Sequence, residues 1–204
     1  MAQLLVIAKA PVPGKAKTRL CPPCTGEQAA ALAEAALADT LDAVAETPCE
    51  GRVLVLEGAP GSWLPPDFEI VAQRGDGLGE RLAAAFAECD GPALLIGMDT
   101  PQVSPELLRE ALAALESPGT DAVLGPCEDG GYWAIGLRSP DPRAFDGVPM
   151  SSSLTGACQR RRLDELGLAV RELPTLRDVD YIEDARSVAA EAPDGRFARA
   201  LEAV

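Results

Sequence analysis

Continuous apolar runs between turn residues restrict the fold of this chain more than any other feature of its sequence. Residues 93–97 read Ala-Leu-Leu-Ile-Gly, and residues 4–8 read Leu-Leu-Val-Ile-Ala. Strands that lack alternating polar residues are buried on both faces, as they are in a parallel sheet covered by helices. These runs therefore predict an α/β protein with a mostly parallel central sheet.

Further strands and helices alternate along the chain. The pattern predicts additional strands at 52–57, 68–72, 121–125, 132–137 and 168–173. It predicts helices at 25–45, 104–116, 152–166 and 182–190, one that ends near residue 88, and a short terminal helix. This alternation specifies a three-layer α/β/α sandwich. The 204 residues contain no repeat, low-complexity tract or clear linker, so we expect one domain over residues 1–204.

The charge and composition exclude several classes of function. A net charge of −14 repels nucleic-acid backbones and anionic lipid, so neither is an expected partner. The chain has no histidine, which rules out Ser-His-Asp and Cys-His catalysis and histidine-ligated zinc. Without a signal peptide or a run of about 18 apolar residues, the sequence predicts a soluble cytoplasmic protein.

The six cysteines include only one pair with CxxC spacing, Cys21 and Cys24. A four-thiolate zinc site would need a second such pair. A thiol-redox protein built on Cys21 and Cys24 is the weakest of our hypotheses, because the motif follows a basic loop rather than opening a helix after a strand.

A basic loop follows the first strand. Lys9, Lys15, Lys17 and Arg19 place four of the 18 basic residues within eleven positions of an otherwise acidic chain. Gly14 allows close approach of backbone to a ligand, and the cations can neutralise phosphate. The loop has neither Walker nor GxGxxG spacing. Since ligands bind at the carboxyl ends of parallel strands, we favour phosphate binding over a merely solvated loop.

Three aspartates are candidates for metal binding. Asp99 lies just after the 93–97 strand, where Pro101 stops the strand, and the following helix already has Ser104 as its cap. Asp178 and Asp180 precede another predicted helix, which is also an ordinary place for acidic residues. Carboxylates near strand ends suit Mg²⁺ bound to nucleotide phosphates.

Residues 129–133, Asp-Gly-Gly-Tyr-Trp, have two readings. Asp-Gly and Gly-Gly pairs are common in hairpin turns, so the segment is explained by its local structure alone. Two adjacent aromatic residues beside a carboxylate, in a chain with 4% aromatic residues, also suit the binding of a sugar or another acceptor.

Several blocks, taken in order, resemble a GT-A-like family of bacterial proteins of poorly defined function. Its members are often described as glycosyltransferases, some in arsenosugar biosynthesis, and the family is similar to phospholactate guanylyltransferase and molybdenum cofactor guanylyltransferase. The blocks are 8–14 (Ala-Lys-Ala-Pro-Val-Pro-Gly), 17–20 (Lys-Thr-Arg-Leu), 77–81 (Gly-Leu-Gly-Glu-Arg), 96–101 (Ile-Gly-Met-Asp-Thr-Pro), 129–133 and 178–180 (Asp-Val-Asp).

This resemblance implies a GT-A-like nucleotide-diphospho-sugar transferase fold and a bound Mg²⁺ or Mn²⁺. It implies that Lys17 and Arg19 contact phosphates, that Asp99 is the principal metal ligand and that Asp180 is a second one. The nucleotide-binding residues expected from the matching blocks are Lys9, Pro11, Gly14, Lys17, Thr18, Arg19, Gly77, Gly79, Glu80 and Arg81. The expected acceptor-binding residues are Gly130, Gly131, Tyr132 and Trp133, and the expected catalytic residues are Asp99, Asp129 and Lys17.

We therefore expect a metal-dependent transferase that uses a nucleotide or nucleotide-sugar donor and a small-molecule acceptor. Glycosyl transfer is the first hypothesis, with Asp129 binding the acceptor or acting as general base. Nucleotidyl transfer that releases pyrophosphate is the alternative. Asp99 is not followed by a second aspartate in a DxD motif, which motivates a further hypothesis of a non-catalytic nucleotide-binding protein with the same fold.

Overall fold

The two apolar runs form adjacent central strands in the computed structural model, which describes residues 1–204. Strand β1 (Gln3–Lys9) pairs in parallel with β4 (Ala93–Gly97). The seven-stranded sheet has the order β3-β2-β1-β4-β6-β5-β7, and only β6 is antiparallel to its neighbours. The predicted mostly parallel sheet is thus confirmed. The other strands are β2 (Arg52–Glu57), β3 (Glu69–Ala72), β5 (Ala122–Pro126), β6 (Tyr132–Leu137) and β7 (Val170–Glu172).

The helices begin close to where the sequence predicts them. Thr25 Oγ1 accepts a hydrogen bond from the amide of Gln28, and Ser104 Oγ accepts one from that of Leu107. A 3-10 turn at Pro142–Phe145 is an addition to the expected elements. The helices are α1 (Gly26–Ala45), α2 (Leu78–Ala87), α3 (Pro105–Glu116), α4 (Thr155–Glu165), α5 (Ile182–Glu191) and α6 (Arg196–Leu201), with 3-10 turns η1 (Thr18–Leu20) and η2 (Pro142–Phe145).

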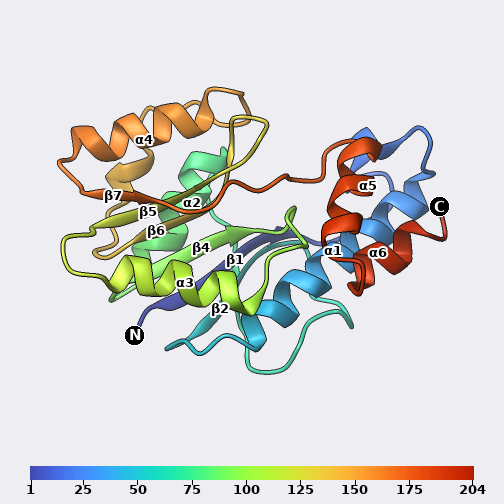
Figure 1. Cartoon of the computed structure of the whole chain (residues 1–204), viewed down its shortest axis with the longest axis horizontal. Helices are drawn as coiled ribbons and strands as arrows, with labels where there is room; N and C mark the ends of the chain where they lie inside the picture. The colour runs from blue at the N-terminus through green and yellow to red at the C-terminus, as the bar shows by residue number, and fades with distance from the viewer.

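Alternate residues of the central strands build two separate cores, one on each face of the sheet. On β1, Leu4 and Val6 face the core formed with α1 and α3, whereas Leu5 faces the core formed with α2, η2 and α4. Figure 1 shows these helices as layers above and below the sheet. This is the predicted α/β/α sandwich.

The strand order reverses between β1 and β4. The chain moves from β1 to β2 and β3 on one side, and then crosses to β4 on the other side of β1. Loops after β1 and β4 therefore diverge, and they leave a crevice at the carboxyl edge of the sheet. This switch point is where open α/β sheets bind ligands.

The C-terminal part of the chain closes one side of this crevice. After β7, residues 173–181 run as an extended segment past the strand ends to α5, which with α6 packs beside α1 (Figure 1). Backbone hydrogen bonds tie this segment to Leu124 and Pro126 of β5 and to Asp99 after β4. None of the helices has the length and apolar character needed to cross a bilayer.

Candidate active site

A cleft of about 910 Å³ occupies the switch point at the carboxyl edge of the sheet. Its walls come from the loop after β1, the start of α2, the loop after β4, the β5–β6 turn, the segment before α4 and the segment before α5. Residues from both ends of the chain thus meet in a single cleft.

Lys17 lies at the centre of the cationic wall. Its ammonium nitrogen is 2.6 Å from Asp99 Oδ1 and also donates a hydrogen bond to the carbonyl oxygen of Val179. The side chain of Lys17 is 9% exposed, and that of Asp99 is 48% exposed. The backbone of Lys17 adopts a left-handed conformation with φ of 47°, which is uncommon for residues other than glycine. Beside it, Arg19 pairs with Asp180. Both predicted metal ligands therefore have a cationic partner.

Replacement of Lys17 by methionine is expected to lower the free energy of unfolding by about 1 to 3 kcal/mol. The change leaves Asp99 and the carbonyl of Val179 without the ammonium donor. Urea unfolding measures the loss. Lys15→Met is the matched control, because Lys15 is exposed and forms no ion pair, and it should change stability by less than about 0.5 kcal/mol. Equal effects of the two substitutions would contradict the bridging role of Lys17.

A second polar cluster lies where β1, β2 and α2 meet. Arg81 pairs with Glu57 and donates a hydrogen bond to Gln73 Oε1 at 3.0 Å, and Lys9 lies 3.5 Å from Glu57. The hydrogen bond from Arg81 lowers the pKa of Glu57 below its usual range. Gln73 Nε2 donates to the carbonyl oxygen of Ala8 at the end of β1. This network fixes polar groups of opposite charge along one edge of the cleft.

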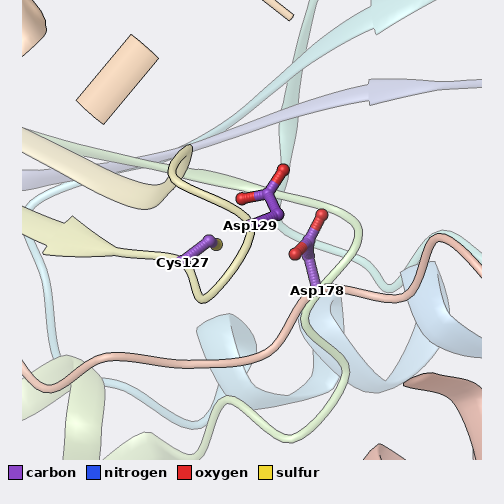
Figure 2. Close-up of side chains that lie close together, drawn as sticks. All are labelled: Cys127, Asp129 and Asp178. Carbon is purple, nitrogen blue, oxygen red and sulfur yellow. The ribbon is translucent and has the colours of Figure 1, made fainter. Parts of the chain in front are cut away.

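The opposite wall is acidic. One ligand atom from each of Cys127, Asp129 and Asp178 lies within 4.8 Å of the other two, and the side chains converge in Figure 2. Burial, together with the nearby carboxylates of Asp129 and Asp180, raises the pKa of Asp178 to about 6. Burial and the nearby carboxylates, foremost Asp178 and Asp129, raise the pKa of the Cys127 thiol, which therefore remains protonated. Neither Asp129 nor Asp178 forms a salt bridge, and the charge of Lys17 only partly offsets the repulsion between these carboxylates at Asp178.

The β5–β6 turn and the segment before α4 form one packed unit. The amide of Gly156 donates to the carbonyl oxygen of Gly130 at 2.8 Å, and a Cβ at Gly130 would lie 2.1 Å from the carbonyl oxygen of Ser153. The amide of Gly131 donates to Asp129 Oδ1 at 2.7 Å, which orients that carboxylate. The turn therefore needs glycine at position 130 both for its φ of 90° and for the close approach of Ser153.

The two aromatic residues after this turn have different surroundings. Trp133 is buried in the core shared with α1 and α3, and its indole nitrogen donates to the carbonyl oxygen of Pro174. Tyr132 points to the opposite face, where its hydroxyl contacts Gln159. Burial raises the pKa of Tyr132, so the phenol remains neutral. The two rings do not form a single exposed aromatic surface.

The cleft brings together most of the residues predicted from the sequence. Those that line it are Lys9, Lys17, Thr18, Arg19, Arg81, Asp99, Asp129, Gly131, Tyr132, Trp133 and Asp180. Pro11, Gly14, Gly77, Gly79, Glu80 and Gly130 lie outside its lining; Glu80 accepts a hydrogen bond from the amide of Asp76. The predicted site residues did not include Gln73, Cys127, Tyr181 or the serines at 151–153, which also line the cleft, as does Asp178, a metal candidate from the sequence that the resemblance did not assign as a ligand. For the serines, the run of three consecutive hydroxyl residues was the one sequence pattern that could have identified them.

Residues 29–152 match a family described as "Uncharacterized protein conserved in bacteria (DUF2064)". The chain belongs to this family. The DUF2064 match includes Asp99 and Asp129, whereas the basic loop and Asp178 lie outside it. No curated protein matches the chain.

Solved structures confirm the fold of this DUF2064 protein. One from Desulfovibrio desulfuricans G20, provisionally assigned as a nucleotide-diphospho-sugar transferase, has a TM-score of 0.82 and 28% identity, with 98% of this chain and 99% of that chain covered. CMP:2-keto-3-deoxy-manno-octonic acid synthetase complexed with CTP has a TM-score of 0.62 and 10% identity, with 95% and 99% covered. Rv0371C of Mycobacterium tuberculosis H37Rv, in complex with manganese, has a TM-score of 0.54 and 21% identity, with 92% and 97% covered. The predicted resemblance and fold are thus confirmed.

Proposed function

We propose that this protein is a metal-dependent transferase, formed by a single domain over residues 1–204, that uses a nucleotide or nucleotide-sugar donor. Glycosyl transfer is our first choice. The observation that carries the proposal is one cleft, at the switch point of the sheet, which contains both a basic loop and two carboxylates that form no salt bridge. The transferase and CTP-bound structures of the same fold support the choice of donor.

The donor set of the acidic wall fits a hard divalent cation. Mg²⁺ and Mn²⁺ prefer carboxylate oxygens, and the protonated thiol of Cys127 is a poor ligand for them. We therefore assign Asp129 and Asp178 as the residues that would hold the ion. Asp99 and Asp180, the ligands expected from the sequence, lie in the same cleft but would first have to give up Lys17 and Arg19. The manganese complex of a structural neighbour is consistent with such an ion.

The basic loop provides the groups for the donor phosphates. Lys15 is exposed and forms no ion pair, so its charge is available to a ligand. Lys17 and Arg19 place further positive charge beside the carboxylates. Because the whole chain has a net charge of −14, a donor polyanion is expected to bind where the cations that line the cleft are gathered.

In glycosyl transfer, a hydroxyl oxygen of the acceptor attacks the anomeric carbon of the donor sugar, and the bond from that carbon to the diphosphate oxygen breaks. The electron pair leaves with the nucleoside diphosphate, and the hydroxyl proton passes to a carboxylate of the cleft. When bound, a divalent metal would neutralise the charge that develops on the leaving diphosphate. Lys15, Lys17 and Arg19 would stabilise the same charge.

The role of Asp129 as general base, expected from the sequence, competes with its role as metal ligand. Asp129→Asn separates the two roles. Loss of a base lowers the rate and leaves metal affinity unchanged, whereas loss of a ligand lowers both. Release of pyrophosphate rather than nucleoside diphosphate would establish nucleotidyl transfer instead, and the absence of any turnover would favour a non-catalytic binding protein.

A thermal-shift panel of nucleotides and nucleotide sugars, each with and without Mg²⁺ or Mn²⁺, tests the proposal. A ligand at a hundred times its dissociation constant stabilises the native state by about 2.7 kcal/mol. For a chain of this size, that corresponds to a rise of about 5 to 10 °C in the melting temperature. We expect this rise for at least one nucleotide and only when metal is present. No metal-dependent rise with any nucleotide would contradict the proposal.

A further inference from the structure

The two halves of the cleft differ in charge. All five cations that line it come from the loop after β1, the end of β1 and the start of α2: Lys9, Lys15, Lys17, Arg19 and Arg81. The other half is lined by residues between 127 and 155, and none of those lining residues is a lysine or an arginine. The arginines of α4 do not reach this half, because they form ion pairs with Asp146, Asp164, Glu165 and Glu172.

Three consecutive serines, Ser151–Ser153, provide the polar groups of the half without cations. We call them the serine loop. Ser151 and Ser153 are exposed, and neither hydroxyl makes a hydrogen bond within the protein. Ser152 Oγ accepts a hydrogen bond from the amide of Leu154. These hydroxyls can therefore both donate to and accept from a ligand.

Hydrogen bonds and packing define the conformation of the serine loop. The amide of Ser152 donates to Thr155 Oγ1 at 3.1 Å, and that hydroxyl donates to the carbonyl oxygen of Pro149 at 2.8 Å. Ser151 has a φ of 56°, a conformation that persists in residues other than glycine only when the surroundings enforce it. The carbonyl of Ser153 also packs against Gly130, which places the loop beside Asp129. A preformed polar surface next to the acidic wall suits ligand binding.

Apolar side chains accompany the serines. Met150 lines the cleft directly before them and lies beside Gly79 at the start of α2, next to Leu78, which also lines the cleft and is 42% exposed. Such surfaces, with hydroxyl groups and apolar carbon but no cation, match a neutral molecule that carries hydroxyl groups. In the absence of a bound metal, a phosphate ester would lose its hydration here without gaining a cationic partner.

We propose that the serine loop binds an uncharged, hydroxyl-bearing acceptor with an apolar portion, and that Ser151 and Ser153 donate or accept its hydrogen bonds. The inference rests on the proposed transferase function, since it names the substrate that would meet the donor. It also favours transfer to a hydroxyl group over transfer to a phosphate ester.

Amide chemical-shift titrations of the full chain test the inference with two probes that share a ring. Phenyl β-D-glucopyranoside is neutral and hydroxylated, and phenyl phosphate is anionic. We expect the glycoside, at millimolar concentration, to shift the amides of residues 151–156 and 130–131, and phenyl phosphate to shift only those of the basic loop, residues 9–20. Because the serine loop is preformed, we expect glycoside binding without a nucleotide.

Two substitutions and a matched control complete the test. Ser151→Ala and Ser153→Ala are each expected to weaken glycoside binding about three- to tenfold, the effect of one lost hydrogen bond. Ser139→Ala should have no effect, because Ser139 is also exposed but follows β6 at the opposite edge of the sheet. Ser153→Arg should allow phenyl phosphate to shift the loop.

Three results would overturn the inference: phenyl phosphate bound at the serine loop of the unsubstituted protein, no shift of the loop by the glycoside, or glycoside affinity unchanged in both alanine variants. The nucleotide panel is a separate measurement. If the glycoside binds at the loop while no nucleotide binds with metal, the neutral-ligand site stands and the transferase proposal fails.

Discussion

Replacement of Gly130 by alanine is expected to abolish turnover and to lower the free energy of unfolding by about 2 to 5 kcal/mol. The added methyl would lie 2.1 Å from the carbonyl oxygen of Ser153, and the position has a φ of 90° that an L side chain rarely adopts. Both strains are relieved only if the β5–β6 turn moves away from the serine loop. That movement displaces Asp129, whose carboxylate is oriented by the same turn.

Gly119→Ala is the matched control for this prediction. Gly119 has a φ of 80°, but a Cβ there would meet no atom within 4 Å, and the residue lies between α3 and β5 at the edge of the sheet opposite the cleft. It should lose about 1 to 2 kcal/mol from backbone strain alone and retain turnover. Urea unfolding and product formation are the measurements. If Gly130→Ala lost no more stability than the control and kept its activity, the turn and the serine loop would not act as a unit.

The central sheet could be predicted from the sequence because strands that are buried on both faces appear as continuous apolar runs. The runs at 4–8 and 93–97 contain no polar residue, a pattern typical of strands that lie between two helical layers. Helix starts were predictable for a local reason, since Thr25 and Ser104 satisfy amide groups within three residues of themselves. The turn η2 was not, because its cap, Asp141, lies in a segment rich in proline, aspartate and glycine that also fits an irregular loop.

The cleft was predictable only in part, because its decisive contacts join distant segments. Lys17 contacts Val179, 162 residues later, and no local pattern pairs them. The sequence therefore identified Asp99 and Asp180 as carboxylates near strand ends but not that each would be ion-paired. One feature of the aromatic pair was predictable from the sequence. Side chains of adjacent strand residues point to opposite faces of the sheet, so Tyr132 and Trp133 could not share one aromatic surface.

Asp178→Asn is expected to change stability and metal binding in opposite directions. In the folded protein the pKa of Asp178 is raised to about 6, from 3.8. The unfolded chain therefore ionises at lower pH than the native state, and stability is lost as the pH rises from about 4 through about 6. Asparagine resembles the neutral carboxyl group, so the variant should avoid this loss.

At about pH 8 and without metal, we expect Asp178→Asn to be more stable than the unsubstituted protein by about 1 kcal/mol. The full shift of about two units would give about 3 kcal/mol, but the side chain is only half-buried and water screens the repulsion. At about pH 4 the two proteins should be equally stable, because the carboxyl group is then largely protonated in the native state. Urea unfolding in the presence of a chelator at both pH values measures the difference.

Addition of Mn²⁺ or Mg²⁺ should then stabilise the unsubstituted protein and leave Asp178→Asn unchanged, because the variant lacks one of the two carboxylates that we assign to the ion. Asp99→Asn and Asp180→Asn are the comparison variants. Each removes the partner of a cation, so each should be less stable than the unsubstituted protein yet retain its response to metal. If Asp99→Asn lost the response and Asp178→Asn kept it, the ion would belong to the ligands expected from the sequence, and Lys17 would have to release Asp99 when metal binds.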